Sequence, residues 1–268
     1  MQRQIATTKF HAALGLLLLI AAACAPFSFA QTQPPGAPQY LVVRVTRVKP
    51  EMAQEYRPFM QNETIPALKK GGVKLRNTLV TANFGEALEY ITVEPAESLK
   101  QFDGQAPLLK ALGDESNRAW SAKWLRMIAG SHTYLVQLRP DLSVNMPKPG
   151  TPHTKLAFSV RITVAPGRVQ EYESYVKADV LPILQKAYPK GVLVSKVVVG
   201  GNCNEYFMVV FADSFEELEK SAQVATREGF TRIQPKTAGI ILHTENNVLR
   251  YVPELSISPS APKTGSKE

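Results

Sequence analysis

One segment of this sequence occurs twice, and the repetition limits what the chain can fold into. Residues 54–70 read QEYRPFMQNETIPALKK, and residues 170–186 read QEYESYVKADVLPILQK. Shorter matches flank both segments: VRVT at 43–46 with VRIT at 160–163, EY at 89–90 with EY at 205–206, and RPDLS at 139–143 with VPELS at 252–256. The spacing predicts two copies of a unit of about 100 residues, over residues 39–143 and 155–256.

Each copy predicts the same order of secondary structure. The first copy predicts a strand over 40–48, a helix over 51–70, strands over 73–81 and 88–93, helices over 98–112 and from Asp114, and a strand over 132–138. The second copy predicts the matching elements over 156–164, 167–186, 192–199, 205–211, 214–225 and 242–252. The order β-α-β-β-α-β is that of a ferredoxin-like split βαβ unit, so we expect an α+β fold.

A proline lies late in the long first helix of each copy, at Pro66 and Pro182. Proline has no backbone N–H and its ring clashes with the preceding turn, so it bends or thins a helix. We therefore expect both helices to bend near these residues, which lets the helix end follow a twisted sheet.

The residues around these prolines form a pattern that both copies share. In the first copy it is KP at 49–50, Tyr56, IPAL at 65–68 and Lys70, and in the second it is APG at 165–167, Tyr172, LPIL at 181–184 and Lys186. Within such a unit, the pattern resembles the dimeric α/β-barrel superfamily, in particular its antibiotic-biosynthesis-monooxygenase-like and NIPSNAP-like domains. The resemblance implies that the tandem copies pair their antiparallel sheets into one intrachain barrel, as a monomer with an internal pseudo-dimer or as a homodimer.

The first thirty residues are typical of a secretory signal. Arg3 and Lys9 precede an apolar run over 12–23, and SFA at 28–30 is a small-x-small cleavage site. We expect cleavage after Ala30 and export to the periplasm or the medium. In the alternative, AAAC at 21–24 is a lipoprotein box and Cys24 is lipidated, although this box lacks the usual leucine. No other apolar run is long enough to predict a transmembrane span.

Two further segments lie outside the predicted units. Residues 144–154 contain three prolines and a glycine, which predicts a stiff, extended linker. Residues 257–268 are rich in proline, serine, lysine and glycine, which predicts a disordered tail.

Charge and motifs exclude several classes of function. Removal of Arg3 and Lys9 with the signal lowers the formal net charge from +8 to +6, and the remaining cations are scattered among acids. Without a basic stripe or a recognised motif, we expect no nucleic-acid partner. Walker, Rossmann, Gly-x-Ser-x-Gly, CxxC and HExxH patterns are absent from the sequence, and we predict no cofactor.

Polar side chains on the first strands are the first candidates for a site. Arg44 and Thr46 alternate with valines, and Arg161 and Thr163 do the same in the second copy. We expect this polar face to look into the space between the sheets, where the third strands carry Glu89 and Glu205. A buried guanidinium needs a partner, so we predict the ion pairs Arg44–Glu89 and Arg161–Glu205. They form either a structural network or a site for an anionic or polar ligand.

Histidines and tryptophans are the other candidates. HT at 132–133 and HT at 243–244 recur near the start of each last strand, so His132 and His243 join the predicted ligand-binding set. The histidine spacing matches no metal motif, and we predict no metal site. Some proteins of the resembled superfamily bind haem through a histidine, but no local pattern supports haem here. Trp120 and Trp124 predict core packing, with an aromatic wall of a pocket as the alternative.

These observations lead to three hypotheses about function. The first is an exported tandem α/β-barrel protein that binds a small organic ligand between its sheets. The second, implied by the resemblance, is a cofactor-independent monooxygenase or isomerase that holds its substrate in the same cavity. The third is a structural or partner-binding module whose barrel is filled with side chains.

Overall fold

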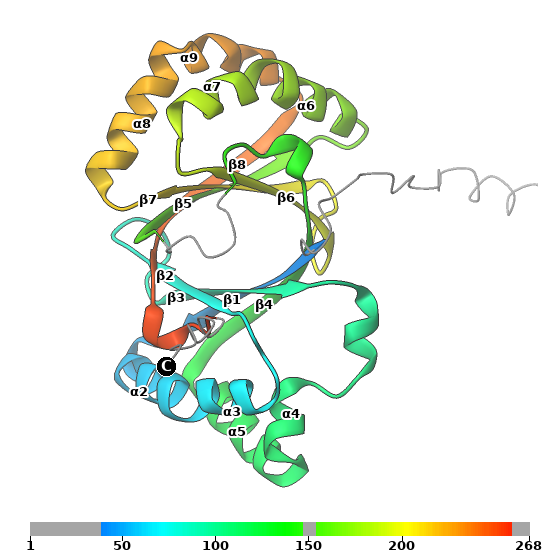
Figure 1. Ribbon diagram of the computed structural model, residues 1–268, viewed down its shortest axis with the longest axis vertical. Helices are drawn as coiled ribbons and strands as arrows, with labels where there is room; N and C mark the ends of the chain where they lie inside the picture. Colours follow the sequence, from blue (N-terminus) through cyan, green and yellow to red (C-terminus); the bar gives the residue numbers. More distant parts are fainter. Residues whose placement is uncertain (1–38, 147–153, 259–268) are drawn as a thin grey trace, which may run out of the picture. The chain divides into compact units, whose positions relative to one another are not determined.

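Eight antiparallel strands form the centre of the molecule in the computed structural model, which describes residues 39–146 and 154–258. The strands are β1 (Tyr40–Val48), β2 (Asn77–Thr81), β3 (Glu89–Ala96), β4 (Ile128–Leu138), β5 (Leu156–Val164), β6 (Val192–Val199), β7 (Glu205–Ala212) and β8 (Ile241–Tyr251). They close a barrel in the order β1-β3-β2-β8-β5-β7-β6-β4 (Figure 1). The fold is therefore α+β, as predicted, with a closed antiparallel barrel.

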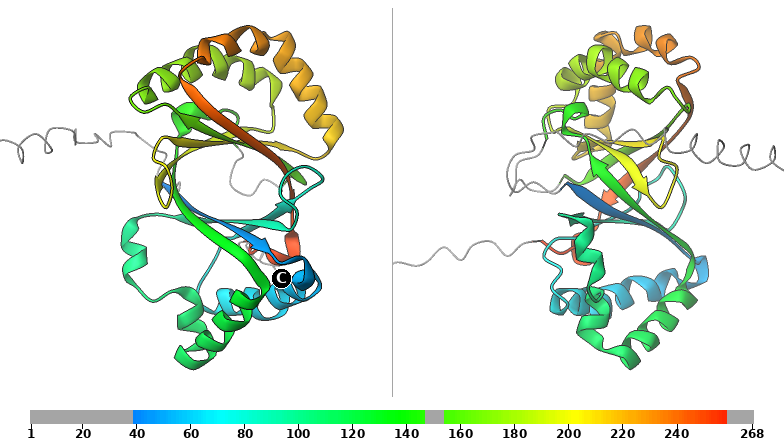
Figure 2. Two further views of the ribbon diagram at one scale, coloured as in Figure 1. Left: turned by 180° about the vertical axis from the view of Figure 1, so that it is seen from behind. Right: turned by 90° about the vertical axis from the view of Figure 1, so that its right-hand side faces the viewer.

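Helices cover the outer faces of the barrel strands, as Figures 1 and 2 show. Those of the first half are α2 (Ala53–Phe59), α3 (Ile65–Lys70), α4 (Pro107–Leu112) and α5 (Asp114–Met127). Those of the second half are α6 (Val169–Tyr175), α7 (Leu181–Ala187), α8 (Phe215–Arg227) and α9 (Phe230–Ile233). Each half follows the order that the sequence predicts.

The described residues of the two halves share one barrel within one compact unit. One seam joins β2 to β8, and the other joins β4 to β6. The last short 3-10 turn of each half lies against the other half, because Arg139 binds Glu173 of α6 and Arg57 of α2 binds Glu254. One chain therefore suffices to close the barrel.

The segments predicted at the ends and between the halves lie largely outside the described residues. These are the signal with Cys24 and Ala30, residues 147–153 of the linker, and residues 259–268 of the tail. Ile257, the first residue assigned to the tail, is buried and pairs with Arg76 through two backbone hydrogen bonds of 2.8 Å. Ordered structure therefore continues past residue 256.

Both long helices are interrupted by a widened π turn just before the prolines. The turns cover Met60–Thr64 and Val176–Val180, and Pro66 and Pro182 lie at the start of the helical segments that follow. A π turn bonds each N–H five residues back instead of four, which changes the helix spacing just before the residue that lacks a donor. A π turn followed by a proline occurs at the equivalent position in both halves.

The register of the strands corrects the predicted orientation of β1. Thr46 lies opposite Tyr90 in the first half, and Ile162 lies opposite Tyr206 in the second. In the structure Arg44 therefore corresponds to Val160. The match of VRVT with VRIT had aligned Arg44 with Arg161, which is one residue further along the strand. Because side chains alternate along a strand, a slip of one residue moves each of them to the other face. The prediction that Arg44 and Thr46 face the space between the sheets is wrong, since they face the helices.

Candidate functional site

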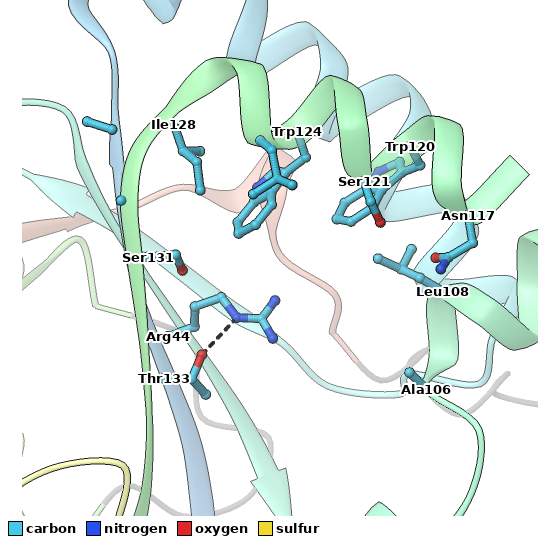
Figure 3. A pocket seen from close by; sticks show the side chains of 13 residues that line it. Arg44, Ala106, Leu108, Asn117, Trp120, Ser121, Trp124, Ile128, Ser131 and Thr133 are labelled. Carbon is cyan, nitrogen blue, oxygen red and sulfur yellow. Dashed lines mark hydrogen bonds between the residues drawn. The ribbon is translucent and has the colours of Figure 1, made fainter.

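A pocket lies between the sheet and the helices of the first half (Figure 3). Its outer part has a volume of about 710 Å³, and a deeper part of about 130 Å³ shares Arg44, Trp120 and Trp124 with it. Strands β1 and β4 form one wall, while α4 and α5 form the other. We call the two parts together the helix–sheet pocket.

Arg44 projects from β1 into this pocket, as Figure 3 shows. Its Nε donates a hydrogen bond of 3.2 Å to Thr133 Oγ1 on β4. Among the described residues no carboxylate lies within ion-pairing distance of its guanidinium. Burial lowers the pKa of Arg44, and the nearby charge of Arg76 lowers it further. The charge of Glu94 opposes these two effects. Arg44 is thus a partly desolvated cation without an ion-paired carboxylate among the described residues, which is a costly state for a protein to maintain.

The deeper part of the pocket contains a second arginine, which does have a partner. Arg76 forms an ion pair with Glu94 of β3, and its side chain is only 5% exposed. With Arg44, the pocket therefore holds two guanidinium groups against one carboxylate. The excess positive charge favours an anion in the space beside Arg44.

Aromatic rings form the helical wall opposite Arg44. Trp120 and Trp124 of α5 stack with centroids 5.9 Å apart at 11°, and Trp120 also stacks on Phe59 at 5.9 Å. Trp120 Nε1 donates to Thr64 Oγ1 at 2.9 Å, which holds the ring in place. Burial raises the pKa of Tyr56, at the base of the pocket, to about 12 and keeps it neutral. Fixed, flat rings of this kind suit a planar ligand.

A second cavity of about 890 Å³ lies inside the barrel and has lining residues from all eight strands. Leu41, Val43 and Val45 of β1 line it, in place of the polar face of β1 that the sequence predicted there. Arg161 of β5 faces this cavity, as predicted. We call this space the barrel cavity.

The structure confirms one of the two predicted ion pairs. Arg161 Nη2 lies 2.9 and 3.0 Å from the carboxylate oxygens of Glu205, and Nη1 lies 3.5 Å from Glu245. The pair Arg44–Glu89 is wrong, because Glu89 lies opposite Arg47 on the other face of the sheet. The error of one residue in aligning the two halves assigned the side chains of β1 to the wrong faces of the sheet. The same error led to the prediction that Arg44 and Glu89 share a face.

The other predicted site residues are divided between the two cavities and the surface. Thr46 lines the helix–sheet pocket and is buried, with its hydroxyl 3.3 Å from that of Ser131. Glu89 and His132 line the barrel cavity, where the His132 ring packs 4.3 Å from Tyr134. Thr163 lies opposite Glu205 in the barrel, and His243 is exposed with Nε2 3.2 Å from Glu245. The predicted set is therefore not one site.

The sequence interpretation missed residues of the helix–sheet pocket. Arg76 and Glu94 were not predicted, and the aromatic wall was only the alternative for Trp120 and Trp124. When the two halves are aligned so that EY at 89–90 matches EY at 205–206, Arg44, Arg76 and Glu94 each align with a valine. This difference could have identified the three residues from the sequence.

The helix–sheet pocket offers no side chains suited to the metal or haem chemistry considered from the sequence. No group of three or more His, Cys, Asp or Glu side chains among the described residues is arranged to hold a metal ion. The residues that line the helix–sheet pocket include no histidine, so a haem ligated by histidine does not fit there. Within the described part of the chain, no helix has the length and apolar character of a membrane span.

Known structures share the fold of this chain at very low sequence identity. A putative monooxygenase from Lactobacillus acidophilus matches with a TM-score of 0.53 and 9% identity, over 82% of this chain and 95% of that one. A putative monooxygenase from Fusobacterium nucleatum matches with a TM-score of 0.53 and 15% identity, over 81% and 93%. An anthrone oxidase-like protein matches with a TM-score of 0.51 and 10% identity, over 81% and 92%. At these identities the likeness shows the fold alone.

Comparison of the amino-acid sequence with known families and proteins finds no relative. No protein-family model and no curated protein matches this chain. The fold is consistent with the ferredoxin-like barrels that the sequence resembles, and any statement on function depends on the two cavities themselves.

Proposed function

We propose that the protein binds a small planar aromatic compound with an anionic group, such as an aromatic carboxylate or a phenolate, in the helix–sheet pocket. The observation that carries the proposal is the guanidinium of Arg44, which faces stacked tryptophans and has no carboxylate partner among the described residues. A ligand carboxylate would supply the missing counter-ion through two parallel hydrogen bonds. The ligand ring would pack against the wall formed by α5.

Binding of a panel of small ligands tests this function. We expect 4-hydroxybenzoate to bind in calorimetric titrations and its neutral isostere 4-hydroxybenzamide to bind much more weakly. A charge-assisted hydrogen bond contributes about 1.5–3 kcal/mol. The substitution Arg44→Met should therefore weaken the benzoate by about 10- to 100-fold and leave the benzamide nearly unchanged. Arg118→Met, at an exposed position of α5, is the matched control and should bind as the wild type does.

Two results would contradict the proposal. Equal affinity for the acid and the amide would mean that Arg44 does not recognise charge. Unchanged benzoate binding in Arg44→Met would place the anion somewhere else on the protein.

A second candidate function is a cofactor-independent monooxygenase that oxidises a phenol bound in this pocket. The observation that favours it is again Arg44, since a guanidinium stabilises a phenolate, the electron-rich form that reacts with O₂. The names of the structural neighbours support this activity only loosely. Oxygen uptake with 1,4-dihydroxynaphthalene tests it: we expect uptake above the uncatalysed rate that Arg44→Met abolishes. Equal rates for both proteins, or no uptake above background, would leave ligand binding as the function.

The sequence-based hypothesis placed the ligand between the sheets, which is the barrel cavity. The chemistry of this cavity suits a ligand other than an aromatic anion. The barrel cavity is apolar over much of its lining and acidic at one end, so it does not suit the anion that Arg44 favours. The hypothesis of a filled barrel does not agree with a cavity of about 890 Å³.

We also infer that the chain contains two copies of a ferredoxin-like unit and is a monomer with an internal pseudo-dimer. The matched element order, the matched π turns and the barrel closed within one chain support this inference. Light scattering on the purified protein tests the monomer. A stable dimer mass would favour the homodimer instead.

Export is the last part of the proposal, and residues 1–30 of the sequence support it. We propose a secreted or periplasmic protein that begins at Gln31. Mass spectrometry of the protein recovered from the host's exported fraction tests this, and a lipidated N-terminus at Cys24 is the result that would replace it.

A further inference from the structure

The barrel cavity has two ends of different chemistry. One end, which we call the apolar end, is lined mainly by aliphatic and aromatic side chains together with the amide of Asn77. The apolar residues are Leu41, Val43, Val93, Ala157, Leu193, Val209, Phe211 and Leu249. The other end carries acidic side chains, which we call the acidic rim: Glu86, Glu89, Glu205 and Glu245. Two arginines, Arg47 and Arg161, lie among them.

The strand directions explain why the charges gather at one end. Neighbouring strands are antiparallel throughout the barrel, so the C-terminal ends of β1 and β5 lie beside the N-terminal ends of β3, β4, β7 and β8. Arg47 is at the C-terminal end of β1, and Glu89 and Glu205 begin β3 and β7. The apolar residues come from the opposite ends of the same strands.

The rim contains more negative than positive charge. Glu205 and Glu245 both pair with Arg161, and Glu86 lies 3.9 Å from Arg47. The carboxylate of Glu89 has no ion pair or hydrogen bond with any described residue. Burial raises the pKa of Glu89, and the neighbouring Glu86 raises it further. The charge of Glu89 is therefore incompletely compensated by the protein.

Other groups at this end also lack partners or present aromatic faces. Asn247 Oδ1 is buried without a hydrogen-bond donor among the described residues. Tyr134 and Phe207 meet edge to face with centroids 5.6 Å apart, and both line the cavity. Two histidines also lie near this end: His132, which lines the cavity beside Tyr134, and the exposed His243 beside Glu245. An ammonium group carries three donors and no acceptor, and it interacts favourably with carboxylates and aromatic faces.

We propose that the barrel cavity binds an amphiphilic amine, with its ammonium group at Glu89 and Asn247 and its apolar tail among the aliphatic residues at the far end. The volume of about 890 Å³ lies within the range of ligand pockets, and the apolar lining provides the burial that such a tail needs. This site is separate from the helix–sheet pocket, and its ligand has the opposite charge. Each proposal can therefore fail without the other.

Three ligands with the same tail and different heads test the proposal on the full chain. Calorimetric titration with n-octylammonium, n-octanol and n-octanoate compares a cationic, a neutral and an anionic head. We expect octylammonium to bind about tenfold more tightly than octanol, and octanoate to bind weakest. Octanoate binding as tightly as octylammonium would overturn the proposal, and so would the absence of octylammonium binding.

Substitutions then locate the head and the tail. Glu89→Gln should reduce the affinity for octylammonium about tenfold and leave that for octanol unchanged, whereas Glu51→Gln, at an exposed position, should change neither. Ser159→Phe and Ser195→Phe each add a ring to a different wall of the cavity and should abolish binding of all three ligands. Ser116→Phe, on the exposed face of α5, is their control. If either folded cavity variant binds octylammonium as the wild type does, the ligand is not in the barrel.

Discussion

Equivalent positions beneath the helices carry opposite chemistry in the two halves of the molecule. The first half has polar side chains and the second has apolar ones: Arg44 with Val160, Thr46 with Ile162, Thr64 with Val180, Arg76 with Val192, Thr78 with Val194, Thr92 with Met208, and Glu94 with Val210. The second half packs these residues into one continuous core with Tyr172 and Tyr206. The first half keeps a pocket in the same place.

The difference shows that the fold does not require the polar set. The second half forms the same sheet and helices with valines, so the guanidinium groups of the first half are not explained by folding. Arg76 at least has Glu94 as a partner, whereas Arg44 has no carboxylate partner among the described residues. The ligand that we propose would explain why such a costly residue is present.

Charge beneath the helices of the second half is used differently, because the buried arginine there is fully paired. This arginine, Arg139, comes from the last turn of the first half and packs against α6. Arg139 donates to both oxygens of Asp141 at 2.8 Å and also binds Glu173, which accepts a hydrogen bond of 2.6 Å from Tyr206. These hydrogen bonds raise the pKa of Arg139, although its burial alone would lower it. Arg139 therefore stabilises the fold, in contrast to Arg44.

The largest effect should come from giving the second half the arginine of the first. Val192→Arg puts a guanidinium into a core position that is 0% exposed and contains no carboxylate equivalent to Glu94. We expect the free energy of unfolding to fall by about 4 kcal/mol or more, measured by urea denaturation. Val192→Met is the apolar control and should cost about 1–2 kcal/mol. A loss below about 1 kcal/mol for the arginine would mean that this half also contains a pocket.

Removal of a carboxylate from the Arg139 cluster should have the next largest effect. Glu173→Gln leaves Arg139 with Asp141 as its one remaining acid, and we expect a loss of about 2–3 kcal/mol in the free energy of unfolding. Glu171→Gln, on the exposed side of the same helix, should leave it nearly unchanged. Equal effects for the two variants would show that the cluster does not stabilise the second half.

Acid should weaken the same cluster in a defined range of pH. The hydrogen bonds from Arg139 and Lys177 lower the pKa of Asp141 from 3.8 to about 2, against the effect of its burial. A lowered pKa in the folded state stabilises the protein above the unfolded pKa, and this stabilisation is lost as pH falls through the folded pKa. We expect Asp141→Asn to reduce the pH dependence of stability between pH 4 and pH 2 by about 1 kcal/mol, after allowance for solvent screening. An unchanged slope would contradict the assignment.

The smallest effect on stability should come from removing the unpaired arginine. Arg44→Val copies the residue of the second half and eliminates the cost of a desolvated cation. We expect the free energy of unfolding to stay within about 1 kcal/mol of the wild type or to rise. Arg139→Met in the same assay provides the contrast, since it removes the ion pair of Glu173 and leaves Asp141 with Lys177 alone. A loss of more than about 2 kcal/mol for Arg44→Val would mean that Arg44 serves the fold.

Much of the fold was predictable because it depends on repeated, local patterns. Residues 40–48, 156–164 and 192–199 were predicted with the bounds that the structure has, and both long helices are interrupted by a π turn next to the prolines. The sites were less predictable because they depend on register. The short match of VRVT with VRIT is out of step with the EY matches by one residue, which reversed β1 and produced the wrong pair Arg44–Glu89. Arg161 needed no such comparison, and its pairing with Glu205 is confirmed.

Other parts of the site depend on contacts that no sequence pattern reports. Trp120 and Trp124 follow a helical period that fits core packing as well as a pocket wall, and only the position of α5 over β1 and β4 distinguishes the two. Asn247 Oδ1 has no hydrogen-bond donor, and the Glu89 carboxylate has no ion pair, among the described residues. Both features arise only when the strands close the barrel, so no local sequence pattern predicts them.

Tryptophan fluorescence tests the central claim most directly, because both tryptophans of this chain line the helix–sheet pocket. The measurement is a titration of the wild type and of Arg44→Met with 4-hydroxybenzoate and with 4-hydroxybenzamide. We predict saturable quenching by the benzoate in the wild type, lost in Arg44→Met, and little response to the benzamide in either protein. Benzoate binding seen by calorimetry without any change in tryptophan emission would contradict the claim that the first half holds the anion site.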